Sequence, residues 1–382
     1  MKILLITPIY HIEGRPDLFH DSSAIHYLVS PLAKDNDIKV VDTYCSSFRE
    51  LFTRQGLRKA FSKQKKYSYD KNGVSVDLYE YQFLPKQIKF SKKQAKSVKK
   101  VFVDTINDFN PDVVVVHFPT YYQGVIEKGL FDCPTVCVLH KTDINRISVD
   151  KSYCSFINDS FDLIGSRSES IKKSASQHGI KVSDFIISSG IEEHSIDCNP
   201  RNKKPTQILY AGKLIERKNV DIIIKSFVEL KKQKPDSQTR LKIVGSGNEL
   251  EKLKKIAPSD VEFCKEMPRA DVLKEMCNAD VFVMPSVQET FGLVYLEAMS
   301  TGCITIGTKN EGIDGVIIDN KNGYLVNPTI HELTNLFIHI FSMSVNEINA
   351  ISKAAIDTAK KYSIDNTSKY YLAFLKQSLR KA

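Results

Sequence analysis

Residues 284–302 read Met-Pro-Ser-Val-Gln-Glu-Thr-Phe-Gly-Leu-Val-Tyr-Leu-Glu-Ala-Met-Ser-Thr-Gly, and this stretch decides the fold. Residues 280–284 form a short apolar run that is typical of a buried strand. Thr290 to Ser300 carries helical spacing and ends at Gly302. The sequence therefore predicts a strand, a turn at 285–289 and a helix.

The predicted helix begins at Thr290-Phe291-Gly292-Leu293, where backbone N–H groups lack acceptors within the helix and the macrodipole is positive. An anion such as a phosphate is favoured there. Glu289 precedes this point and Glu297 follows it by about two helical turns, so both carboxylates could face one ligand. Because carboxylates accept hydrogen bonds from neighbouring hydroxyls, a nucleotide-sugar site fits the pattern. For the spacing alone, a solvated helix face remains the alternative.

The identities of these residues resemble a family motif. The residues that carry it are Pro285-Ser286, Glu289-Thr290-Phe291-Gly292, Leu296-Glu297-Ala298-Met299 and Gly302. Together they resemble the donor site of the retaining group 1 family of GT-B glycosyltransferases. The resemblance implies that Glu289 is catalytic and holds the donor sugar, and that Glu297 holds the ribose. It also implies that the amides of Phe291, Gly292 and Leu293 bind the diphosphate.

The same resemblance implies a fold and an activity. The expected α/β fold is GT-B, with two Rossmann-like parallel domains facing across a cleft and a C-terminal helix that crosses back to the first domain. The expected activity is that of a metal-independent, retaining hexosyltransferase that uses a nucleoside diphosphate sugar, with a UDP-sugar favoured, and needs no further cofactor.

Length and composition agree with a soluble globular protein of two domains. The chain has 382 residues, 42% hydrophobic and 26% charged. We expect an acceptor-side domain at 1–200, a donor domain at 201–364, and packing of 365–382 back onto the first domain. The first apolar run is too short for a signal peptide, so we expect a cytoplasmic protein. The eight scattered cysteines indicate neither a disulfide framework nor a zinc site.

The first domain contributes two site candidates. A strand, loop, helix and strand order at its start predicts a parallel sheet, which binds ligands beyond the carboxyl ends of its strands. Gly14 lies in the first loop, where the family usually has a glycine pair, and it is either a donor-binding residue or a simple turn. His117 and His140 follow two predicted strands. We interpret His117 as structural, while the resemblance places His140 near the reacting carbon as a positioning and electrostatic group.

The second domain supplies cations and no predicted metal. Lys213 and Lys218 lie in a turn between a strand and a helix, where they could clamp a diphosphate. In the family these positions are usually Arg and Lys, and solvated lysines are the alternative. The one Asp-x-Asp motif, Asp35-Asn36-Asp37, lies in a predicted solvated turn, so we expect no metal site.

Charge is concentrated in residues 51–100, which contain 14 Lys or Arg against 3 Asp or Glu, an excess of 11 in a chain of net charge +9. The segment includes an amphipathic pattern whose lysines lie away from its apolar face. Docking to an anionic membrane, on the inner face of a bacterial cell membrane, is one interpretation, and a solvated face is the other. No nucleic-acid recognition motif accompanies the charge, so we expect no nucleic-acid partner.

The acceptor is expected to be a glycan or glycolipid, in surface-polysaccharide or glycolipid synthesis. The alternatives are another GT-B chemistry, such as an epimerase or phosphorylase, a catalytically dead GT-B scaffold, and a non-catalytic basic binding protein.

Overall fold

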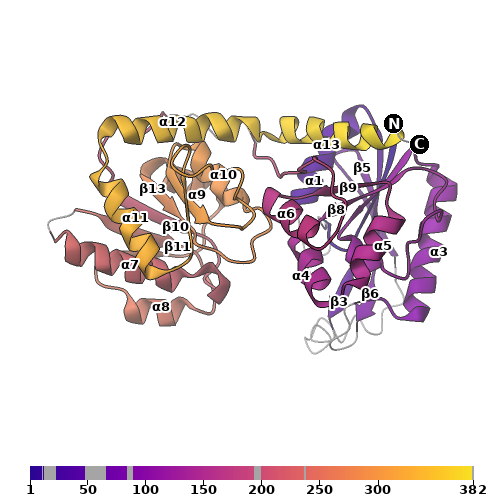
Figure 1. Ribbon diagram of the computed structural model, residues 1–382, viewed down its shortest axis with the longest axis horizontal. Helices are drawn as coiled ribbons and strands as arrows, with labels where there is room; N and C mark the ends of the chain where they lie inside the picture. The colour runs from indigo at the N-terminus through magenta and orange to yellow at the C-terminus, as the bar shows by residue number, and fades with distance from the viewer. Residues whose placement is uncertain are drawn as a thin grey trace. The chain divides into compact units, whose positions relative to one another are not determined.

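The chain folds into two compact units, which Figure 1 shows in a computed structural model. The structure describes residues 1–10, 12, 23–47, 66–83, 89–192, 199–235 and 238–380. Unit 1 comprises Met1–Arg167, Ile171–Gly190 and Ile364–Ala382, and unit 2 comprises Ser168–Ser170 and Ile191–Ser363. Each unit is built around its own parallel sheet, so the prediction of two parallel α/β domains is confirmed.

Unit 1 contains a seven-stranded sheet in the order β4-β5-β2-β1-β7-β8-β9. The strands are β1 (Lys2–Thr7), β2 (Asp37–Asp42), β4 (Lys66–Lys71), β5 (Val74–Tyr79), β7 (Val113–His117), β8 (Thr135–Leu139) and β9 (Leu163–Ser166). All neighbours pair in parallel except β4 and β5, which form an antiparallel hairpin through Asn72 and Gly73. Both turn residues have positive φ, as the tight hairpin turn requires.

Helices cover this sheet and a small parallel pair, β3 (Cys45–Ser47) with β6 (Tyr81–Phe83), completes unit 1. The helices are α1 (Ser23–Val29), η1 (Ser30–Lys34), α3 (Lys92–Phe109), η3 (Pro119–Tyr122), α4 (Lys141–Val149), α5 (Ser152–Ser160), α6 (Glu169–Gln177) and α13 (Ile364–Leu379). Strands β7 and β8 are buried along their whole length, because their β-branched and apolar side chains are covered on both faces.

The C-terminal helix α13 belongs to unit 1, which confirms the expected return of the chain to the first domain. Its side chains Tyr371, Phe374 and Leu375 are fully buried in the same core as strands β1 and β2. The start of the helix lies against Gly190, where an added Cβ would come within 2.7 Å of the Ile364 Cα. Glycine is therefore required at 190 for this close approach.

Unit 2 contains a six-stranded parallel sheet in the order β12-β11-β10-β13-β14-β15. The strands are β10 (Gln207–Ala211), β11 (Arg240–Val244), β12 (Val261–Cys264), β13 (Val281–Val283), β14 (Ile304–Thr308) and β15 (Tyr324–Val326). The helices are η5 (Glu216–Lys218), α7 (Val220–Gln233), α8 (Leu250–Ile256), α9 (Arg269–Asn278), α10 (Leu293–Ser300), α11 (Ile330–Ser342) and α12 (Val345–Lys361). One continuous apolar core joins them.

Two further expectations meet the structure here. Across the described ranges, no helix has the length and apolar character to cross a membrane. Six of the described cysteines are free thiols, whereas Cys277 is disulfide-bonded, which the scattered spacing of the cysteines did not indicate. Spacing along a chain does not reveal which cysteines folding brings together.

Candidate active site

The turn between β13 and α10 is longer than the sequence predicted. Helix α10 begins at Leu293, so the expected start at Thr290 was wrong. The physical reason is Gly292, which caps the helix with a φ of +82° in the left-handed region and so separates it from the preceding loop. Consequently Leu293 stands in the first helical turn, while Phe291 and Gly292 lie just before it.

Glu289 in this turn forms an ion pair with Lys218. The Lys218 Nζ lies 2.6 Å from the Glu289 Oε2, and both side chains are largely buried, with exposures of 11% and 16%. Ser286 donates its hydroxyl to the same oxygen at 3.3 Å, and Arg217 approaches it at 3.5 Å. One carboxylate oxygen is thus shared by two cations and a hydroxyl.

Burial dominates the electrostatics of this pair. It lowers the pKa of Lys218 from its ordinary value, although the neighbouring Glu289 carboxylate acts to raise it. Desolvation therefore outweighs the single opposite charge, and a second anion beside Lys218 would restore the pKa.

Hydrogen bonds to backbone groups hold the two turns of this site together. The Asn219 side chain donates to the carbonyl of Pro285 at 2.8 Å, and the amide of Val287 donates to the carbonyl of Arg217 at 2.9 Å. On the other side, the Glu289 amide donates to the Glu311 carboxylate at 2.9 Å. The position of Glu289 is therefore fixed by tertiary contacts as well as by its own loop.

Lys213, the other predicted clamp residue, is exposed at the carboxyl end of β10. Its carbonyl accepts a hydrogen bond from the Tyr210 hydroxyl at 2.8 Å, which fixes the backbone of the turn. The cation that approaches Glu289 together with Lys218 is instead Arg217, which the sequence reasoning missed. Its position directly before Lys218 in the same turn was the available signal.

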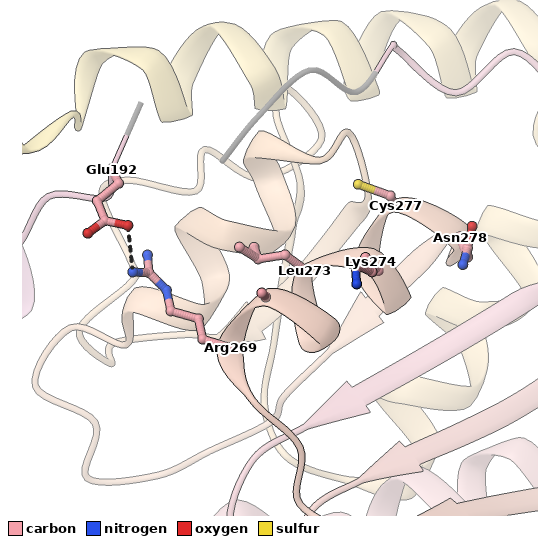
Figure 2. A pocket seen from close by; sticks show the side chains of 7 residues that line it. Glu192, Arg269, Leu273, Lys274, Cys277 and Asn278 are labelled. Carbon is pink, nitrogen blue, oxygen red and sulfur yellow. Dashed lines mark hydrogen bonds and ion pairs between the residues drawn. The ribbon is translucent and has the colours of Figure 1, made fainter. Parts of the chain in front are cut away.

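Glu297 forms a second ion pair, with Arg269. The Arg269 Nε lies 2.6 Å from the Glu297 Oε1, and its Nη1 lies 3.2 Å from Glu192. Figure 2 shows the Arg269 and Glu192 pair at the rim of a pocket of about 730 Å³ that runs along α9, lined also by Leu273 and Lys274. The sequence did not identify Arg269 as a partner of Glu297, since 28 residues separate them.

His140 lies in unit 1, at the start of α4, within a buried chain of polar groups. Its Nε2 lies 2.9 Å from the Nδ1 of His117, whose Nε2 lies 2.9 Å from the Tyr371 hydroxyl. The imidazole of His140 stacks on Phe118 with ring centroids 3.6 Å apart. His117 is thus structural in the sense that it links His140 to helix α13.

Both imidazoles are neutral in the folded protein. Burial lowers the pKa of His117 and of His140 well below the ordinary value, and the nearby charge of Arg167 lowers each pKa further. Asp143, fully buried, accepts hydrogen bonds from the His140 amide at 2.7 Å and from the Thr120 hydroxyl at 2.6 Å. Burial raises the pKa of Asp143 to about 6, because desolvation outweighs these hydrogen bonds.

Two remaining predictions concern Gly14 and a metal. Gly14 lies outside the described residues, as does the rest of its loop from residue 13 to 22. Among the residues that the structure does describe, no group of three or more His, Cys, Asp or Glu side chains could hold a metal ion.

Comparison with known proteins first defines a class by its fold. Sucrose-phosphate synthase from Thermosynechococcus elongatus matches with a TM-score of 0.69 and 15% identity, covering 100% of both chains. At that identity the similarity shows the fold alone, which is GT-B.

Sequence comparison then identifies the family. Residues 192–358 match the model of the family "Glycosyl transferases group 1". Lys213, Lys218, Glu289 and Glu297 all fall within this range. The matched residues, which make up most of unit 2, are therefore those of a group 1 glycosyltransferase.

Two curated relatives resemble part of the chain. One is the GDP-mannose-dependent alpha-(1-6)-phosphatidylinositol monomannoside mannosyltransferase of Mycolicibacterium smegmatis, 31% identical over 134 residues, which are 32% of this chain and 35% of the relative. The other is the D-inositol 3-phosphate glycosyltransferase of Pseudarthrobacter chlorophenolicus, 33% identical over 127 residues, 31% of this chain and 30% of the relative. The chain thus spans about a third of the length of these relatives.

Proposed function

We propose that the chain is a retaining glycosyltransferase that moves a hexose-type sugar from a nucleoside diphosphate sugar to a hydroxyl acceptor. The observation that carries this proposal is the 2.6 Å ion pair of Lys218 with Glu289 in the turn before α10. A cation suited to a diphosphate and a carboxylate suited to sugar hydroxyls are adjacent there. Membership of the group 1 family supports the same assignment.

In this proposal the protein stabilises the departing diphosphate by fixed electrostatics. Lys213 and Lys218 bind its oxygens together with the amides of Phe291, Gly292 and Leu293, at the positive end of α10. Because these groups neutralise the charge that develops on departure, the step needs no metal. Arg217 is a third cation available at the same turn.

The transfer step exchanges one bond for another on the same face of the sugar. The bond between the anomeric carbon and the phosphate oxygen breaks, and a bond from the acceptor oxygen to that carbon forms. The acceptor proton passes to the departing phosphate oxygen. Glu289 holds the hydroxyls of the transferred sugar. Glu297 holds the ribose, whose hydroxyls compete with Arg269 for the Glu297 carboxylate.

His140 positions the reacting groups and acts as a neutral dipole. Its lowered pKa excludes a role as a charged proton donor near neutral pH, since burial favours the uncharged imidazole. We assign the acceptor to unit 1 and the donor to unit 2.

For the acceptor we propose a glycan or glycolipid at the inner face of a bacterial cell membrane. The name of the mycobacterial relative, a phosphatidylinositol monomannoside mannosyltransferase, supports a lipid acceptor. Helix α3 supports a membrane surface, because Lys92, Lys93, Lys96 and Lys100 are exposed on it. We favour UDP in the donor, and GDP is the alternative suggested by that same relative's name.

A thermal-shift screen with UDP, GDP, ADP and their common sugar conjugates tests the donor. A ligand at 100 times its dissociation constant stabilises the protein by about 2.7 kcal/mol. We expect a shift with one nucleotide, reduced in Lys218→Gln and retained in the surface control Glu251→Ala. No shift with any nucleotide would contradict the proposal. Transfer of a radiolabelled sugar to extracted glycolipids then tests the reaction, and label released without transfer would favour another GT-B chemistry.

A further inference from the structure

Unit 1 holds a buried cation directly after β9, beside the polar chain of His140. Arg167 is 2% exposed, and its Nη2 donates a hydrogen bond to the Ser189 hydroxyl. Its Nε and Nη1 are buried and have no hydrogen-bond partner among the described residues. Burial lowers the pKa of this guanidinium to about 10, so it stays charged at neutral pH.

The neighbours of Arg167 supply no compensating negative charge. His117 and His140 are close enough for Arg167 to lower their pKa, and both are neutral. Burial raises the pKa of Tyr371, which therefore keeps its proton. Within the described parts of the chain, Arg167 forms no ion pair. Arg167, the two imidazoles and Tyr371 together thus carry a net positive charge and several hydrogen-bond donors. Asp143, which accepts a hydrogen bond from the His140 amide, forms no ion pair with Arg167.

Such an arrangement is unfavourable unless an anion completes it. A buried charge without a partner strongly destabilises a protein, because desolvation is not repaid by attraction. Guanidinium N–H groups match the oxygens of phosphate and carboxylate groups especially well. The alternative is a purely structural Arg167 that ties β9 to the segment at Ser189.

We propose that Arg167 binds an oxyanion of the acceptor substrate, a phosphate or a carboxylate, beside His140. The word acceptor rests on the proposed function, which assigns the donor to unit 2. The donor cations Lys213 and Lys218 both lie in unit 2, whereas Arg167 and His140 lie in unit 1 at the carboxyl ends of neighbouring strands. The acceptor is therefore an anionic molecule, and Arg167 is a specificity residue for its charge.

The test compares inorganic phosphate with chloride at equal ionic strength, by thermal denaturation of the full chain. The control Arg380→Gln removes the same charge from an exposed position in the same unit. We expect phosphate to raise the Tm of the wild type and of Arg380→Gln by about 2 °C or more. In Arg167→Gln we expect phosphate to raise the Tm by less than half as much as in the wild type. In the double variant Arg167→Gln with Lys218→Gln, we expect phosphate to leave the Tm unchanged. An undiminished rise in Arg167→Gln would overturn the proposal.

A structural role predicts a different pattern, which separates it from anion binding. Without phosphate, Arg167→Gln is at least as stable as the wild type if the charge is uncompensated. A lower Tm together with an unchanged phosphate response identifies a structural residue instead. If Arg167→Gln does not fold, the Nε–H resonance of Arg167 in the wild type gives the answer. It shifts on phosphate addition if the site exists, and a fixed resonance contradicts the proposal.

A second arm distinguishes the acceptor from the donor as the source of the oxyanion. With UDP at saturation, the Arg167-dependent response to phosphate persists if the anion belongs to the acceptor. Its loss would assign the site to the donor diphosphate and overturn the acceptor assignment. An Arg167-dependent phosphate response without any nucleotide shift would contradict the proposed glycosyl transfer and leave the oxyanion site in place.

Discussion

Two candidate sites, one in each unit, differ in how the charge of their cations is compensated. In unit 2, Lys218 pairs with Glu289 and Arg269 pairs with Glu297, so each cation already has a carboxylate at 2.6 Å. In unit 1, Arg167 has a serine hydroxyl and two neutral histidines nearby, and no carboxylate among the described residues. A ligand at Lys218 or Arg269 must compete with an existing ion pair, whereas an anion at Arg167 relieves an unpaired charge.

The same contrast extends to the surface helices. Lysines on α7, α8 and α9 pair with acids three or four residues away, as in Lys225 with Asp221 and Lys252 with Glu249. On α3, among the described residues, Lys99 alone forms an ion pair, with Glu127 of the same unit. Paired surface charges contribute little to binding, because they are already neutralised and exposed to solvent. Unpaired lysines remain available to an external anionic surface.

The largest expected effect comes from removing the carboxylate of the Lys218 and Glu289 ion pair. Glu289→Ala should lower kcat/KM for sugar transfer by about 10²-fold or more, since it removes the group that orients the donor sugar. Steady-state kinetics measures the change, and circular dichroism checks that the protein stays folded. Glu251→Ala, an exposed change on α8, serves as the matched control. Wild-type turnover by Glu289→Ala would remove this residue from the active site.

A double-mutant cycle of Lys218→Met and Glu289→Gln measures how strongly the pair is coupled. Contacting, largely buried charges should couple by about 1–3 kcal/mol in the free energy of unfolding. Urea denaturation of the two single variants and the double variant gives this energy. Arg217 also reaches Glu289, so in Lys218→Met the Glu289 carboxylate should keep a small attraction to Arg217. A coupling near zero would mean that solvent already screens the pair.

The two buried histidines beside Arg167 should make the stability of the protein depend on pH. The folded pKa of His117 and of His140 is lowered, so below about pH 6.5 the unfolded chain binds protons that the folded chain does not. Stability therefore falls on acidification, by about 1.4 kcal/mol per histidine for each pH unit. The raised pKa of Asp143, about 6, acts in the opposite direction between pH 6 and 4, where only the folded state takes up that proton.

His140→Gln isolates one of these contributions. It should reduce the slope of unfolding free energy against pH below pH 6 by about one proton, whatever its effect on absolute stability. Urea denaturation at a series of pH values measures the slope, and the exposed His331→Gln is the control. An unchanged slope would mean that His140 takes up a proton in the folded state.

The smallest effect per residue concerns the surface of α3. Charge reversal at Lys92, Lys96 and Lys99 should weaken binding to anionic liposomes, with each lysine contributing at most about 1 kcal/mol. Lys99 should contribute least, because it is paired with Glu127. The control reverses Lys232, Lys252 and Lys254, which already have acidic partners. If both triple variants lost liposome binding equally, the effect of the α3 lysines would come from the net charge of the protein alone.

Much of the fold could be read from local patterns. Apolar runs such as residues 113–116 and 280–284 predicted buried strands, and the structure has β7 and β13 there. The β4 and β5 hairpin was missed, although Asn72-Gly73 between alternating residues is a typical hairpin signal. It lies inside the basic segment, whose many lysines obscure the alternation of apolar and polar residues. The start of α10 was misplaced because helical spacing continues through residues that Gly292 excludes from the helix.

The sequence by itself determined the two α/β sheets and the motif shared with group 1 glycosyltransferases, because periodicity and residue identity are local properties. Tertiary structure alone decided which charges are paired. Lys218 meets Glu289 across 71 residues, and Arg269 meets Glu297 across 28. It also decided that Arg167 is buried without a counter-charge, since burial depends on what the rest of the chain packs around a residue.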